Sequence, residues 1–132
     1  MRSSEHSLRD LVMTLVSIGE ILVALAILAL PREVASLLVD VDLDGRGLII
    51  VRIMGIAILA LGVTWWKAAR DAGRLSLYSA GFVVYNVGVG ALFGWAALAA
   101  SHPVLPWIVC AVHLVAGVTF GVLDVFARRQ FA

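Results

Sequence analysis

The chain has 132 residues, of which 62% are hydrophobic and 14% charged, with a formal net charge of +1. Soluble domains contain roughly 45–50% apolar residues, so this composition excludes a water-soluble globular protein, whose surface needs more charge than this chain carries. The near-neutral charge and the lack of a basic reader motif exclude nucleic acid as an expected partner, and the single cysteine, Cys110, excludes an internal disulfide and a CxxC redox pair.

Four long apolar segments predict four transmembrane helices, at about residues 8–30, 48–67, 75–100 and 104–126. Each is close to the 20 or so residues that a helix needs to cross a hydrocarbon core of roughly 30 Å. The first segment is longer than the roughly 7–15 apolar residues of a signal peptide, so we expect it to be a retained membrane helix. The predicted fold class is therefore an all-α, integral membrane four-helix bundle, formed by a single transmembrane domain over residues 1–132.

The connection between the first two of these helices contains a second kind of helical pattern. Val34, Leu37, Leu38 and Val41 occur at positions i, i+3, i+4 and i+7, which places them on one face of a helix. The other faces are polar, so we expect a short helix at about residues 32–41 that lies in the plane of the membrane interface.

Lysine and arginine residues predict the orientation of the bundle. Seven of them fall in the two termini and in the connection between the second and third predicted helices: Arg2, Arg9, Lys67, Arg70, Arg74, Arg128 and Arg129. The opposite side has two, Arg32 and Arg46. Because cytoplasmic segments carry the excess of positive charge, both termini are expected in the cytoplasm. Residues near the helix ends are expected to anchor the bundle at the two interfaces: Trp65, Trp66, Lys67, Trp95 and Trp107.

Each predicted transmembrane helix carries one strongly polar residue, and these are Glu20, Arg52, Asn86 and His113. A charge at the centre of a bilayer costs roughly 2.5–3.5 kcal/mol on insertion scales, so we expect Arg52 to pair with Glu20 on a neighbouring helix. One interpretation is a structural ion pair that fixes which helices face each other. The other is a proton- or ion-binding carboxylate at Glu20, with His113 as a relay.

His113 is the one histidine placed deep in a predicted helix, so a haem held by two histidines of this chain is not expected, and we predict no cofactor. Two interpretations stay open for its side chain. It is either a neutral core histidine with a hydrogen-bonded neighbour, or a group lent to a cofactor or quinone that is shared with a neighbouring protein.

Glycines recur every fourth residue in the third and fourth predicted helices, at Gly90 and Gly94 and at Gly117 and Gly121. Such GxxxG patterns let helices approach closely in lipid. They predict either packing inside one bundle or a seam between copies of the chain.

The acidic run around Asp40, Asp42 and Asp44 imitates the first half of a calcium-binding loop. The twelfth position of such a loop should be a bidentate glutamate, and here it is Val51. These aspartates are therefore a weak calcium candidate, and a solvated acidic loop is the preferred interpretation.

The pattern R-x-x-G-x-x-x-L-x-x-G, which runs from Arg52 through Gly55 and Leu59 to Gly62, resembles small bacterial four-helix proteins that are broadly DoxX-like. Tyr85-Asn86 and His113 are also similar to features of these proteins. The resemblance implies a multi-pass protein of the bacterial inner membrane with a four-helix fold. It supplies no active site.

No catalytic motif is present in the sequence: there is no nucleophile elbow, HExxH, P-loop or GxGxxG. We therefore expect a protein that is not an enzyme. The preferred function is a small accessory or structural subunit in the lipid bilayer, which forms a homo-oligomer or packs on a larger membrane complex. The alternative is a small proton-coupled transporter or channel that uses Glu20.

Overall fold

The structure is a computed structural model that describes residues 2–71, 75–99, 102 and 104–129. This part of the chain is built from helices and contains no strand. In chain order the helices are α1 (Arg2–Ala29), α2 (Pro31–Val39), α3 (Gly45–Ala69), α4 (Leu75–Ala99) and α5 (Val104–Arg129). The prediction of an all-helical bundle with a short helix between its first two long helices is confirmed.

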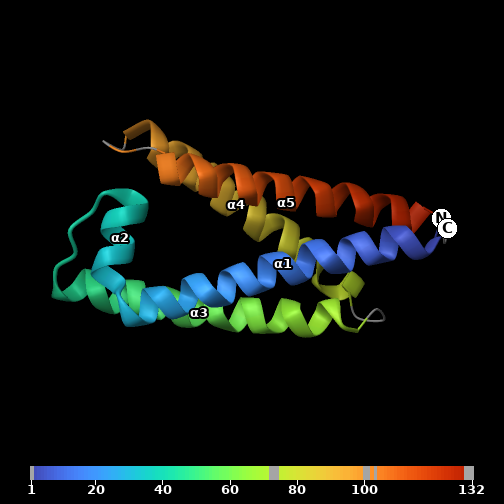
Figure 1. Ribbon diagram of the computed structural model, residues 1–132, viewed down its shortest axis with the longest axis horizontal. Coiled ribbons are helices and arrows are strands. Elements are labelled where there is room, and N and C mark those ends of the chain that lie inside the picture. Colours follow the sequence, from blue (N-terminus) through green and yellow to red (C-terminus); the bar gives the residue numbers. More distant parts are fainter. Residues whose placement is uncertain (1, 72–74, 100–101, 103, 130–132) are drawn as a thin grey trace.

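Four of the helices are long and apolar enough to cross a membrane: Leu8–Ala29, Gly45–Ala69, Tyr78–Ala99 and Val104–Phe126. These spans begin and end within three residues of the predicted segments, and α3 begins three residues earlier than predicted. The described chain thus has the helices of a small multi-pass membrane protein. The beginning of α1 and the end of α5 lie at the same end of the bundle (Figure 1).

Local side-chain chemistry explains where α2 and α3 begin and end. Pro31 starts α2, where its missing N–H costs nothing. Asp40 ends this helix in the left-handed conformation (φ 55°), and its backbone N–H donates to the carbonyl of Ser36. Asp44 then caps α3, since its Oδ1 accepts a hydrogen bond from the N–H of Gly47 at 2.6 Å. This cap explains the early start of α3.

The long helices form two antiparallel pairs, α1 with α3 and α4 with α5. Glycines bring the members of each pair together. A Cβ atom on Gly62 of α3 would lie 3.1 Å from the carbonyl oxygen of Ser17 in α1. A Cβ atom on Gly90 of α4 would lie 3.2 Å from the carbonyl oxygen of Cys110 in α5. At both places the helices approach more closely than a side chain allows, as is typical of small residues at helix contacts in membranes.

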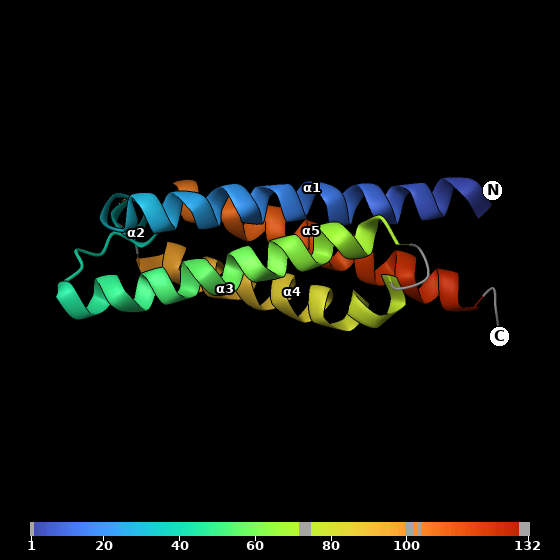
Figure 2. The same cartoon turned by 90° about the horizontal axis from the view of Figure 1, so that it is seen from below.

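The two pairs meet at one end of the molecule and diverge toward the other, where α2 crosses the gap (Figure 1). Figure 2 shows the molecule from the side of α1 and α3, with α4 and α5 behind them. The core occupies the end where the two pairs meet. Its largest members are Met13, Trp65, Phe82 and Phe120, contributed by α1, α3, α4 and α5. The ring of Phe82 lies 4.7 Å from that of Phe120 and 5.0 Å from that of Trp65, so aromatic packing joins the two pairs.

Candidate functional site

Polar side chains from three helices meet where the two pairs begin to diverge. Tyr85 of α4 donates its hydroxyl hydrogen to Oε2 of Glu20 in α1, at 2.9 Å. Nε2 of His113 in α5 lies 3.6 Å from the other carboxyl oxygen, Oε1. Nδ1 of the same imidazole lies 3.0 Å from Oδ1 of Asn86 in α4. We call Glu20, Tyr85, Asn86 and His113 the polar cluster.

The hydrogen bonds of Asn86 determine which nitrogen of His113 carries a proton. The side chain of Asn86 is fully buried, and its Nδ2 lies 2.9 Å from the carbonyl oxygen of Phe82. Because a carbonyl only accepts, the atom facing it must be the amide nitrogen, and the amide oxygen therefore faces His113. Nδ1 of His113 must then donate to that oxygen. Its Nε2 is left to accept when the ring is neutral, or to donate to Glu20 when the ring is charged.

The polar cluster lines part of a large apolar cavity between the two helix pairs. The cavity has a volume of about 640 Å³ and is lined by residues of all five helices. Among its described lining residues, the polar side chains are those of the polar cluster, and the others are aliphatic or aromatic or belong to Gly19. Ligand sites are typically cavities of about 300–1,000 Å³ with apolar walls and a few converging polar groups. The arrangement can therefore hold an apolar molecule that carries one polar end.

The aromatic core closes the cavity on the side of the chain termini. The ring of Trp65 packs edge-on against Tyr85 at 5.0 Å, so the cluster tyrosine rests directly on the core. On the opposite side, α2 contributes Val34, Ala35 and Leu38 to the cavity wall. The short helix predicted to lie in the membrane interface thus forms part of the cavity wall.

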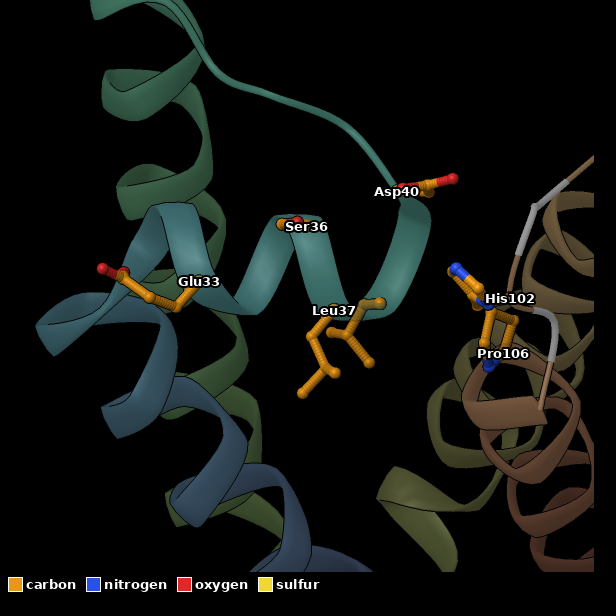
Figure 3. Close-up of a pocket in the computed structure, with 7 residues that line it drawn as sticks. Glu33, Ser36, Leu37, Asp40, His102 and Pro106 are labelled. Atoms are coloured by element: carbon orange, nitrogen blue, oxygen red, sulfur yellow. The ribbon is translucent and has the colours of Figure 1, made fainter.

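A second pocket, of about 420 Å³, lies between α2 and the beginning of α5 (Figure 3). Glu33, Ser36 and Asp40 extend along α2, and His102 and Pro106 stand across the pocket from them. Leu38 lines both the pocket and the cavity, so the two adjoin at α2. We call this pocket the mouth.

The structure brings three of the four predicted polar residues together, and Arg52 is the exception. Arg52 is exposed on α3, and the ion pair expected between it and Glu20 does not form among the described residues. The register of α1 and α3 is the cause. Gly62 faces Ser17, which is near Glu20. Arg52 lies ten residues (62 − 52), or about 15 Å, from Gly62 toward the beginning of α3.

Of the five predicted interface anchors, Trp65 is buried and the other four are exposed or partly exposed. Trp65 is 2% exposed and belongs to the core, so it does not anchor the bundle at a surface. Trp95 and Trp107 are 73% and 46% exposed, and Lys67 is exposed. Trp66 is partly buried, with the guanidinium of Arg70 at 4.5 Å from its ring centroid.

The glycine stripes lie between α4 and α5. Cβ atoms on Gly90, Gly94, Gly117 and Gly121 would each contact a residue of the other helix of this pair. The stripes thus serve packing within the described chain, the first of the two predicted roles.

The acidic segment is used for helix capping. Asp40 ends α2 and Asp44 caps α3. No group of three or more metal-ligating side chains occurs among the described residues, so the structure does not assemble a calcium site from Asp40, Asp42 and Asp44.

The sequence did not predict the place of Tyr85 in the polar cluster or an ion pair between Arg9 and Asp124. Tyr85 adjoins Asn86 in the sequence, and this adjacency was the signal for its place in the cluster. Arg9 and Asp124 form a buried ion pair between α1 and α5, with Nη1 and Oδ1 3.3 Å apart. Arg9 precedes Glu20 by eleven residues (20 − 9), and Asp124 follows His113 by eleven residues (124 − 113). This equal spacing is the feature of the sequence that could have predicted the ion pair.

Comparison of the chain with known protein families, curated proteins and solved structures found no match. Its function is therefore inferred from the cavity and the polar cluster.

Proposed function

We propose that this membrane protein is a small carrier that takes a lipophilic molecule into its cavity and uses Glu20 as a proton-exchanging group. The observation that carries this proposal is a cavity of about 640 Å³ whose walls are apolar except for a buried carboxyl group and its polar neighbours. Ionisable groups within membrane spans are costly and are functional candidates for that reason. A bundle that served only as a scaffold would gain packing contacts by filling this space.

The ion pair at the closed end supports a carrier rather than a permanent channel. Arg9 and Asp124 join α1 to α5, and so link one helix pair to the other. Together with the aromatic core they shut the cavity on the side of the termini, while the pairs diverge toward α2 (Figure 1). Release on the other side requires these contacts to separate, as in the rocking of two bundles around a central site.

The excess of Lys and Arg near the termini supports an orientation with the termini in the cytoplasm, so that the mouth faces the outside. The bacterial inner membrane, implied by the DoxX-like resemblance, is the proposed location.

The proposal is tested by filling the cavity. Gly19 lines the cavity, and a Cβ atom built on it has nothing within 4 Å, so the variant Gly19→Leu places its side chain in the open space. Gly88 is equally free of contacts but does not line the cavity, and Gly88→Leu is the matched control. Saturable binding of dodecylamine, dodecanol and dodecanoate is measured on the protein in lipid nanodiscs, with empty nanodiscs subtracted.

We expect at least one probe to bind the wild type and the Gly88→Leu variant alike, and to bind Gly19→Leu about tenfold more weakly or worse. Equal binding to both variants, or no saturable binding of any probe, would refute the proposal.

The accessory role expected from the sequence is favoured by a different observation. Arg52 is exposed on α3, with the exposed side chains of Ile49, Ile53 and Ile56 near it. A charge on an apolar face is stabilised by reaching the head groups or by a partner protein with a carboxylate. Purification in mild detergent separates these outcomes: an accessory subunit retains its partner in the wild type and loses it in Arg52→Leu. Identical behaviour of the two proteins would dismiss the accessory role.

A further inference from the structure

We propose that the lipophilic molecule is a protonated amine, which places its ammonium group on Glu20 and its apolar body in the cavity. This inference rests on the carrier function proposed above and names the class of its substrate. It follows from counting which hydrogen-bonding positions of the polar cluster are already used and which face the cavity unused.

Three donors of the cluster are already used, two of them within the cluster and one on the adjacent backbone of α4. Asn86 donates to the carbonyl oxygen of Phe82, His113 donates from Nδ1 to Asn86, and Tyr85 donates to Oε2 of Glu20. A ligand that can only accept hydrogen bonds, such as a ketone or an ester, must break one of these bonds unless it reaches the second N–H of Asn86 or the proton held by Glu20 and His113. Leaving a buried polar group unpaired costs about 1–3 kcal/mol, so a ligand of this kind is disfavoured.

The unused positions are acceptors. Oε1 of Glu20 lies 3.6 Å from Nε2 of His113, which is longer than a good hydrogen bond. A carboxylate has about four acceptor positions, of which Tyr85 uses one. The phenolic oxygen of Tyr85 and Nε2 of a neutral His113 also accept. An ammonium group, with up to three N–H donors and one positive charge, complements this set.

The charge balance requires that a proton leave when the amine binds. Tyr85 and His113 are the titratable groups that face Glu20 from α4 and α5, while the described lining residues of α2 and α3 are apolar. In the empty site, one proton shared between Glu20 and His113 cancels the carboxylate charge. When the ammonium ion enters, it forms hydrogen bonds with the carboxylate of Glu20, His113 is neutral, and the shared proton leaves to water. One cation enters for each proton released, so the net charge of the site is unchanged.

The mouth favours the same class of ligand. Glu33 and Asp40 line it with two carboxylates, and His102 is the basic side chain among its lining residues. Acidic groups at an opening raise the local concentration of cations. Since Leu38 is shared with the cavity, an amphipathic amine that enters between these groups meets apolar walls next.

The test uses probes with the same tail and different ends, on the wild-type protein in nanodiscs near neutral pH. Dodecylamine carries charge and N–H donors, dodecyltrimethylammonium carries charge alone, dodecanol is neutral and dodecanoate is an anion. We expect dodecylamine to bind at least about tenfold more tightly than dodecanol, and more tightly than dodecyltrimethylammonium. In weakly buffered solution, about one proton should be released for each amine bound.

Two variants assign the effect to Glu20. Glu20→Gln keeps a side-chain oxygen that can accept from Tyr85 but removes the charge, and it should abolish both the preference for the amine and the proton release. Asp42→Asn removes an exposed carboxylate that lines neither the cavity nor the mouth, and it should change neither measurement.

The outcomes separate this inference from the proposed function. If dodecanol or dodecanoate binds the wild type as tightly as dodecylamine, the substrate class is wrong while the cavity function stands. If the amine binds without releasing a proton, proton exchange at Glu20 is wrong as well. If no probe binds saturably, the carrier function itself fails. The wild-type measurements decide these cases even if Glu20→Gln does not fold.

Discussion

Replacing Gly62 by alanine tests how α1 and α3 are held together. The new Cβ atom would lie 2.9 Å from Cγ1 of Ile21, 3.1 Å from the carbonyl oxygen of Ser17 and 3.2 Å from the backbone nitrogen of Ile21. Two of these three contacts are to backbone atoms, which move only if the whole helix moves. Overpacking of this kind costs about 1–3 kcal/mol.

The control for this variant is Gly88→Ala in α4. A Cβ atom on Gly88 meets nothing within 4 Å, so this change adds a methyl group without a clash. Both variants gain up to about 1 kcal/mol of helix propensity, so the difference between them isolates the cost of overpacking. Reversible unfolding in mixed detergent micelles, followed by circular dichroism, should show Gly62→Ala to be less stable than Gly88→Ala by about 1–3 kcal/mol. If Gly62→Ala is as stable as Gly88→Ala, the close approach of the two helices is refuted.

Two further pairs of variants compare buried and exposed residues of one type in the same unfolding assay. Arg9→Met removes one hydrogen-bonded partner of the buried Asp124 and should cost about 1–3 kcal/mol. Arg52→Met, at an exposed position, should change stability by no more than about 0.5 kcal/mol, and the reverse order would contradict the ion pair. Trp65→Ala removes a core ring and should cost about 3–5 kcal/mol, whereas Trp95→Ala should be nearly neutral, and equal effects would contradict the position of Trp65 in the core.

The number and type of the elements could be predicted from the sequence because lipid imposes strong rules on length and polarity. The apolar segments and the stripe at Val34 and Leu38 were sufficient for four long helices and one short one. The start of α3 was misplaced by three residues, since the cap formed by Asp44 continues the helix through Gly45 and Gly47, which are weak helix formers.

The candidate site could be predicted only in part, because helix register is invisible in a hydropathy pattern. Glu20, Asn86 and His113 were predicted as the strongly polar residues of their helices, and the structure brings them together. The cost of a charge in the bilayer also predicted that Arg52 pairs with Glu20. The contact at Gly62 sets a register that separates the two charges, and the rotation of α3 leaves Arg52 exposed.

Trp65 illustrates a second limit. A tryptophan followed by a tryptophan and a lysine at the end of an apolar segment is typical of an interface anchor. The ring of its neighbour, Trp66, contacts the guanidinium of Arg70. Trp65, one residue earlier, points in a different direction and packs on Phe82 and Tyr85. A tryptophan at this end of α3 is a core residue if it lies on the side that faces the other helix pair, and it can be an interface anchor if it does not.

The polar cluster requires His113 to lie between Asn86 and Glu20, with Nε2 beside the carboxyl group and the proton of the neutral ring on Nδ1. Nitrogen NMR on protein labelled with ¹⁵N-histidine tests it directly, with His6→Gln and His102→Gln changes to leave His113 alone. We predict a protonated Nδ1, and a shift of the Nε2 signal when Glu20 is replaced by glutamine. A ring protonated on Nε2 only, with signals that do not respond to Glu20→Gln, would contradict the cluster and the functions built on it.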